Sequence, residues 1–188
     1  MPLRNSVTGA RRARRVPFRA MLLLLLAWPP AWAAENEGTL LKTAYIYNVA
    51  KFTEWPERSH GPVSAPMRFC LVGEDAQVPS LWRLDGRTVK GRHLKVLTPR
   101  GGRMADECDL LYVAASEREH LVELLRTLRQ QPVLTVSELD GFAQAGGMVE
   151  LSPQGKLLRF TIHLGAVRAA ELEISPRLLS LARVIGQD

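Results

Sequence analysis

The sequence predicts an α/β fold in one domain, with a mainly parallel sheet, helices on both faces and a C-terminal antiparallel hairpin. Short apolar segments typical of buried strands alternate along the chain with segments of helical periodicity. This alternation is typical of parallel sheets, in which each helix connects two strands. Near the C-terminus, apolar segments at 148–151 and 157–162 flank the turn-forming sequence SPQGK, which predicts a hairpin on the edge of the sheet.

The first 33 residues have the three parts of a secretory signal peptide. Five arginines between residues 11 and 19 precede the apolar segment AMLLLLLAW, and Ala31-Trp32-Ala33 is a small-x-small cleavage site. The apolar segment is about half as long as the roughly 20 residues that span a bilayer, which argues against a membrane anchor. We expect export, cleavage after Ala33 and a mature domain of residues 34–188.

The beginning of the mature chain is predicted to be an amphipathic helix that ends at Pro56. One stripe of this helix carries most of the rings and consists of residues at steps of three and four: Leu41, Tyr45, Asn48, Phe52 and Trp55. We interpret the rings on this stripe as core residues that pack the helix onto the sheet. Tyr47 lies off the stripe, and an exposed ring there would suit contact with a partner protein or a small aromatic ligand.

Four strands are predicted in the middle of the chain, at 67–73, 93–97, 110–114 and 133–136. A helix over 76–84 connects the first two. The sequence Ser116-x-x-Glu119 is a capping box that would begin a helix after the third strand. The apolar face of this helix has four leucines: Leu121, Leu124, Leu125 and Leu128.

A second helix start, S-x-x-D, follows at Ser137, and a glycine-rich turn runs through Gly146 and Gly147. The glycines are compatible with simple turn geometry; in the alternative interpretation Phe142 projects from a mobile loop and contacts a partner. Ser175 and Pro176 are predicted to begin the last helix. Its inner face would consist of Leu178, Leu179, Ala182 and Ile185.

Two cysteines, Cys70 and Cys108, occur in the mature chain, and an even number in an exported protein predicts one disulfide. In the strand order 2-1-3 of many doubly wound sheets, their strands would be neighbours. A redox or metal-binding pair is the alternative. The sequence has no CxxC spacing, and its four scattered histidines match no zinc pattern, so we expect no metal site.

The charge of the chain is concentrated in the export signal. The 25 basic residues include six arginines in residues 1–33, where there is no acidic residue, which leaves 19 basic against 19 acidic residues in the mature chain. The sequence pI of about 9.8 therefore reflects the targeting segment. A nucleic-acid-binding domain would be expected to retain a basic excess, so we expect no nucleic-acid partner.

Five segments resemble the YfiR-like family of exported bacterial regulators: AYIYNVAKFTEWP, RFCLVGED, CDLLYVAASE, PVLTVSELDGFAQAGGMVEL and RFTIHLGAVRAAELEISPRLLSLARV. They occur in this order over nearly the whole mature chain. The chain departs from the family pattern at His163, Glu171 and Pro176, where Asn, Gly and a small polar residue are usual.

This resemblance implies a periplasmic protein that binds and represses the periplasmic portion of an inner-membrane diguanylate cyclase, and so lowers cyclic di-GMP and biofilm formation. An outer-membrane lipoprotein is a further candidate partner, and an exposed aromatic surface would suit a homodimer. Arg168 and Arg177 in the final segment are candidate partner-binding residues, because arginine is favoured at the centre of interfaces; as the alternative, both are solvated helix residues.

The sequence does not support catalysis. It lacks G-x-S-x-G, H-E-x-x-H, P-loop and G-x-G-x-x-G motifs, and the third predicted strand ends in Ala114, Ala115 and Ser116 where a receiver-type phosphotransfer domain would need an aspartate. Glu74 and Asp75 follow the first strand without a visible partner. We therefore expect neither an enzyme nor a bound cofactor. The alternative function is a periplasmic sensor that binds a small molecule at the strand ends.

Overall fold

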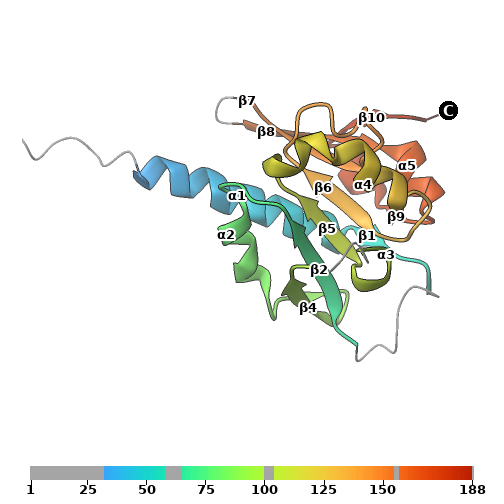
Figure 1. Ribbon diagram of the computed structural model, residues 1–188, viewed down its shortest axis with the longest axis horizontal. Coiled ribbons are helices and arrows are strands. Elements are labelled where there is room, and N and C mark those ends of the chain that lie inside the picture. Colours follow the sequence, from blue (N-terminus) through green and yellow to red (C-terminus); the bar gives the residue numbers. More distant parts are fainter. Residues whose placement is uncertain (1–31, 58–64, 100–103, 155–156, 188) are drawn as a thin grey trace, which may run out of the picture. The chain divides into compact units, whose positions relative to one another are not determined.

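An eight-stranded sheet is the centre of the computed structural model, which describes residues 32–57, 65–99, 104–154 and 157–187 (Figure 1). The strand order is β10-β8-β7-β6-β5-β2-β4-β3. The bounds are β2 Met67–Val72, β3 Thr88–Val89, β4 Arg92–Leu97, β5 Leu110–Val113, β6 Leu134–Ser137, β7 Val149–Gln154, β8 Leu157–His163 and β10 Arg183–Ile185. A separate antiparallel pair is formed by β1 (Thr53–Glu54) and β9 (Glu173–Ile174).

The helices are short except for the first. Their bounds are α1 Trp32–Lys51, α2 Val78–Leu81, α3 Met104–Glu107, α4 Leu121–Thr127, α5 Leu164–Ala169 and α6 Pro176–Leu179, with 3-10 turns η2 Trp82–Leu84 and η3 Ala115–Glu119. Within the described ranges, no helix has both the length and the apolar character needed to cross a bilayer. Residues 1–31 of the predicted signal peptide lie outside the described residues, and the signal peptide remains a prediction.

The topology confirms the predicted α/β class. Strands β4, β2, β5, β6 and β7 pair in parallel, and β7 and β8 form the predicted antiparallel hairpin. The order β4-β2-β5 is the 2-1-3 arrangement expected from the sequence. The hairpin is not at the edge, however, because β10 pairs in parallel with β8, with Val184 opposite Ile162.

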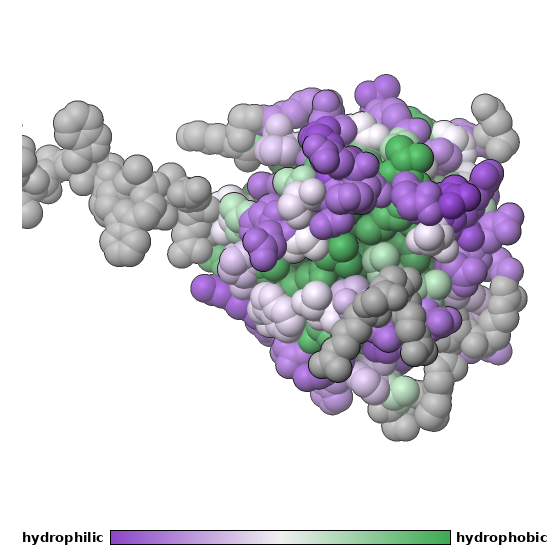
Figure 2. All heavy atoms as spheres, viewed as in Figure 1, coloured by the Kyte–Doolittle hydropathy of each residue, from purple (hydrophilic) through white to green (hydrophobic). Residues whose placement is uncertain are grey.

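Two separate cores cover the two faces of the sheet. In β5, Leu110 and Tyr112 belong to the core under α1, α2, α5 and α6, whereas Leu111 and Val113 belong to the core under α4. This alternation follows from the two-residue period of a strand. The four predicted leucines of α4 are all buried in the second core. Figure 2 shows an apolar area over the middle of this face, surrounded by hydrophilic residues.

The stripe predicted for the first helix was wrong. Among residues 37–51 of α1, the buried ones are Thr43, Ile46, Val49 and Ala50, whereas Leu41 is 46% exposed. The helix ends at Lys51 because the chain then turns into β1, where Thr53 pairs with Ile174 of β9. Tyr45 and Phe52 lie at the margin of the core, and Trp55 is buried in an extended segment after the helix.

Both predicted S-x-x-acid helix starts were also wrong, because each serine hydroxyl bonds elsewhere. The Oγ of Ser116 accepts from the backbone N–H of Glu74 at 2.9 Å, and the segment forms η3. The Oγ of Ser137 donates to the carbonyl of Val113 at 2.6 Å and accepts from the N–H of Leu139 at 3.0 Å, so β6 ends in a turn.

The last predicted helix is much shorter than expected. Ser175 does cap α6, since its Oγ accepts from the N–H of Leu178 at 3.4 Å. The helix nevertheless ends at Leu179, and the chain continues into β10. Ile185, predicted on the inner face of the helix, is therefore a strand residue opposite His163.

Candidate functional site

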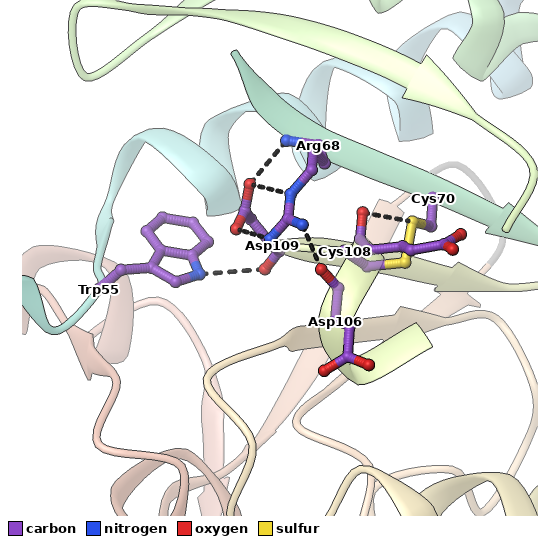
Figure 3. Close-up of a disulfide and its surroundings, with 7 residues drawn as sticks. Trp55, Arg68, Cys70, Asp106, Cys108 and Asp109 are labelled. Carbon is purple, nitrogen blue, oxygen red and sulfur yellow. Dashed lines mark hydrogen bonds and ion pairs between the residues drawn. A yellow bond between two sulfur atoms is a disulfide. The ribbon is translucent and has the colours of Figure 1, made fainter. Parts of the chain in front are cut away.

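The predicted disulfide between Cys70 and Cys108 is present, and it joins β2 to the segment just before β5 (Figure 3). The two Cα atoms are 5.6 Å apart, within the usual range for a disulfide. Both cysteines are buried, at 0% and 2% exposure. A buried disulfide between paired strands is a structural crosslink, because an attacking thiolate needs access to the sulfur atoms.

An ion pair with a buried carboxylate lies beside this disulfide. The carboxylate of Asp109 accepts from the guanidinium of Arg68 at 2.9 and 3.3 Å and from the Arg68 backbone N–H at 2.7 Å (Figure 3). This contact raises the pKa of Arg68 above its ordinary value. The carbonyl of Asp109 accepts from the indole N–H of Trp55 at 3.0 Å. Trp55, from the aromatic segment Ala44 to Glu57, thus anchors that segment to the sheet.

A second polar cluster lies at the carboxyl ends of β2, β5 and β6, where α/β proteins often bind ligands. The Tyr112 hydroxyl donates to Asp75 Oδ2 at 2.9 Å, and Lys42 from α1 pairs with Glu138 at 2.6 Å. Burial raises the pKa of the Tyr112 phenol far above its usual range, and the charges of Glu138 and Asp75 raise it further.

The contacts of Asp75 indicate a structural role for this cluster. Its Oδ1 accepts from the backbone N–H groups of Gln77 and Val78, and its Oδ2 accepts from Tyr112 and from the N–H of Ala115. With four donors around one carboxylate, Asp75 ties α2 and η3 to the sheet and is poorly placed to accept a proton from a substrate. The sequence alone points to Asp75 but not to its partners in this cluster, Tyr112 and Glu138, because neither is near Asp75 in the chain.

The structure places both predicted arginines on the surface, near the β1–β9 pair. The Arg177 guanidinium lies 5.9 Å from the ring centroid of Phe52, in cation–π range. Arg168 lines a cavity of about 510 Å³ together with Trp55 and Leu172. Four acidic residues line the same cavity: Glu54, Glu57, Glu171 and Glu173. The surroundings of Arg168 are therefore acidic, whereas Arg177 lies against a ring.

The other two predicted contact residues are placed differently. Tyr47 is half-buried, and its hydroxyl donates to the carbonyl of Thr88 at 2.7 Å, so it packs α1 against β3. The centroid of its ring lies 5.5 Å from Lys51 Nζ. The expectation that Phe142 projects was wrong, since its side chain is fully buried. It fills the space left by Gly147, where a Cβ would lie 2.2 Å from the ring.

The described residues do not form a site with evident catalytic chemistry. Across the described ranges, no group of three or more His, Cys, Asp or Glu residues is arranged to hold a metal ion. His163 has a structural role, because its Nδ1 accepts from the N–H of Ala166 and so caps the beginning of α5. What the surface does present is an exposed arginine over a ring, a geometry suited to protein recognition.

Comparison with known proteins adds two findings. A family model described as YfiR/HmsC-like matches residues 39–183. A crystal structure of a conserved domain protein from Vibrio cholerae O1 biovar El Tor is similar, with a TM-score of 0.52 at 11% sequence identity. The match covers 78% of this chain and 59% of that protein, so the chain spans less than two thirds of its structural neighbour. At this identity the similarity supports the fold alone.

Proposed function

Because the chain belongs to the YfiR/HmsC-like family, we propose that it is a periplasmic regulatory protein that binds and represses the periplasmic portion of a membrane-bound diguanylate cyclase. The observation that carries this proposal is the length of the family match, which includes nearly all of the predicted mature chain, residues 34–188. The buried disulfide is in keeping with an oxidising compartment.

A protein in the periplasm affects a cytoplasmic enzyme only through a partner that spans the membrane and has two states. The regulator must bind the inactive state more tightly. If the free cyclase were evenly divided between the two states, holding it at about 1% active would require a difference of roughly 2.7 kcal/mol in binding free energy. One protein interface of ordinary size supplies this difference.

The proposed contact surface centres on Arg177 and Phe52. The Arg177 side chain is exposed and the Phe52 ring is half-buried, so a partner could cover both without unfolding the domain. Arg168 lies on the neighbouring helix α5 and extends this surface, although the acidic residues around it reduce its attraction for a negatively charged partner. An outer-membrane lipoprotein and a second copy of the chain are further candidate partners.

Deletion of the gene tests the regulatory function. We expect cyclic di-GMP and biofilm formation to rise, because a repressor is lost, and an exported copy to reverse both effects. A copy without residues 1–33 should remain in the cytoplasm and fail to do so. Unchanged cyclic di-GMP in a deletion strain that expresses a diguanylate cyclase with a periplasmic portion would refute the proposal.

A further inference from the structure

A second cavity, of about 430 Å³, lies between α4 and α5 and shares no lining residue with the cavity around Arg168. Its lining residues come from α4 and the residues just after it, the turn at 144–146, the start of β6 and the segment from the end of β8 into α5. Figure 1 labels these helices and strands. Its volume is in the range typical of sites for small molecules. None of its lining residues belongs to the proposed contact surface.

The apolar lining of the cavity is aliphatic. Leu125, Leu128 and Met148 line it and are buried, whereas Val122 at its margin is 73% exposed. Among the lining residues, none is Phe, Tyr or Trp. A flat aromatic ligand would find no large aromatic side chain to stack on, whereas an alkyl chain would be in contact with leucine and methionine side chains.

The charged lining of the cavity is entirely basic. Its two charged side chains are Arg126 and Arg129, and no Asp or Glu is part of the lining. Arg126 is already paired with Glu123 by hydrogen bonds of 2.8 and 3.1 Å. In the part of the chain that the structure describes, Arg129 has no ion pair. Its guanidinium can therefore bind an anion without first giving up a partner.

His163 adds a polar group of defined tautomer to the wall. Its Nδ1 accepts from the N–H of Ala166 at 3.1 Å. In the neutral ring the proton is therefore on Nε2, so this nitrogen is a donor. Thr135, another polar side chain of the lining, already accepts from the N–H of Met148 at 3.0 Å. The cavity thus combines aliphatic walls with donors and an available positive charge.

From this lining we infer that the cavity between α4 and α5 binds a small aliphatic carboxylate, with its alkyl chain against Leu125, Leu128 and Met148 and its carboxylate on Arg129. A primary alkylamine has the same apolar chain but the wrong charge. Comparing octanoate with octylammonium therefore distinguishes binding of the carboxylate from binding of the alkyl chain alone.

The experiment is a titration of ¹⁵N-labelled protein, expressed from the full-length gene, with each of these two probes. We expect octanoate to give saturating amide shifts at Gly146 and Ala166, which line the cavity, and octylammonium to give none. Arg129→Gln should weaken octanoate binding by about two- to fivefold, the effect of one exposed charged contact. Arg118→Gln is the matched control, because Arg118 is also exposed but lies outside the lining.

A second variant tests the cavity independently of charge. Ala169→Leu adds a larger side chain to a lining position on α5 that is exposed, so the variant should fold and lose saturable octanoate binding. The inference is overturned if octanoate gives no saturating shifts, if octylammonium binds as tightly, or if Arg129→Gln and Arg118→Gln bind octanoate equally. None of these outcomes depends on the cyclase, so the proposed repressor function is tested separately.

Discussion

The side chain of Asp109 accepts two hydrogen bonds from the guanidinium of Arg68, while the adjacent Cys108 forms a disulfide with Cys70, two residues after Arg68. A covalent and an ionic contact therefore hold β2 to the beginning of β5. Asp109 is only 2% exposed, so its charge depends on its two cationic neighbours, Arg68 at 2.9 Å and the buried Arg92 at 3.8 Å. Both contacts should contribute to fixing the two strands against each other.

Removal of the disulfide should therefore destabilise the domain without preventing folding. For a separation of 38 residues, the loss of the crosslink lowers the free energy of unfolding by up to about 4 kcal/mol in the chain-entropy model. The double variant Cys70→Ala, Cys108→Ala, followed by urea denaturation at neutral pH, measures this. Peptide mapping of the parent protein without reductant should recover the two cysteines in one linked fragment; two free thiols would contradict the structure.

The disulfide shows what could be predicted from the sequence. The strands 67–73 and 110–114 were recognisable because continuous apolar segments bounded by polar residues are local features. The parallel order then followed from general rules of α/β topology. The ion pair of Arg68 and Asp109 was not predictable, because it joins residues 41 positions apart whose geometry exists only after the strands pair.

Ambiguous local patterns explain the errors. In the first helix, the predicted stripe contains three aromatic rings, whereas the buried face of the helix contains none. The chain leaves the helix at Lys51 and enters β1, so Trp55 is not a helical residue. At Ser116 and Ser137 the serine hydroxyls satisfy distant backbone groups instead of capping a helix. Ser175 does cap α6, but the helix is short because residues 183–185 form β10, which pairs with β8.

The raised pKa of Tyr112 predicts a loss of stability at alkaline pH. The unfolded phenol ionises near its ordinary pKa of about 10, whereas the folded one stays protonated. Since the unfolded state then binds fewer protons, stability is fully present below about pH 10 and falls above it, by roughly 1.4 kcal/mol per pH unit. Urea denaturation near pH 7 and about pH 11 should show this fall in the parent protein.

The variant Tyr112→Phe should lose this part of the alkaline fall, and near neutral pH it should be less stable by about 1 kcal/mol because the hydrogen bond to Asp75 is removed. Tyr45→Phe is a matched control, since Tyr45 is half-buried and only its ring contact, to Phe160 at 6.1 Å, is a described interaction. An equal alkaline fall in Tyr112→Phe and the parent protein would rule out this origin.

The close contact of Phe142 with Gly147 predicts a steric penalty. A Cβ on residue 147 would lie 2.2–2.5 Å from three ring carbons of Phe142, so Gly147→Ala should lower stability by about 1–3 kcal/mol. The penalty should decrease in a Phe142→Leu background, which a double-mutant cycle in urea measures. Gly38→Ala in α1 is the control, because no atom lies within 4 Å of the position that a Cβ would take there, and it should leave stability equal or slightly higher.

The functional prediction concerns charge reversal on the proposed contact surface. Arg177→Glu removes the cation over Phe52 and presents a like charge to any acidic partner group, so it should raise cyclic di-GMP towards the level of the deletion strain. Because Arg177 is exposed, the lost cation–π contact is worth only about 0.5–1 kcal/mol, and the melting temperature should change by no more than about 2–4 °C.

Two comparisons make this result specific to the surface. Arg168→Glu should have a smaller effect on cyclic di-GMP, because Arg168 already lies among four acidic residues and contributes little net positive potential there. Arg118→Glu, on the exposed η3 segment, should have none. If all three variants repress as well as the parent protein while remaining folded and exported, the partner binds elsewhere. That result would refute the contact surface around Arg177. The regulatory function is tested separately, by the deletion strain.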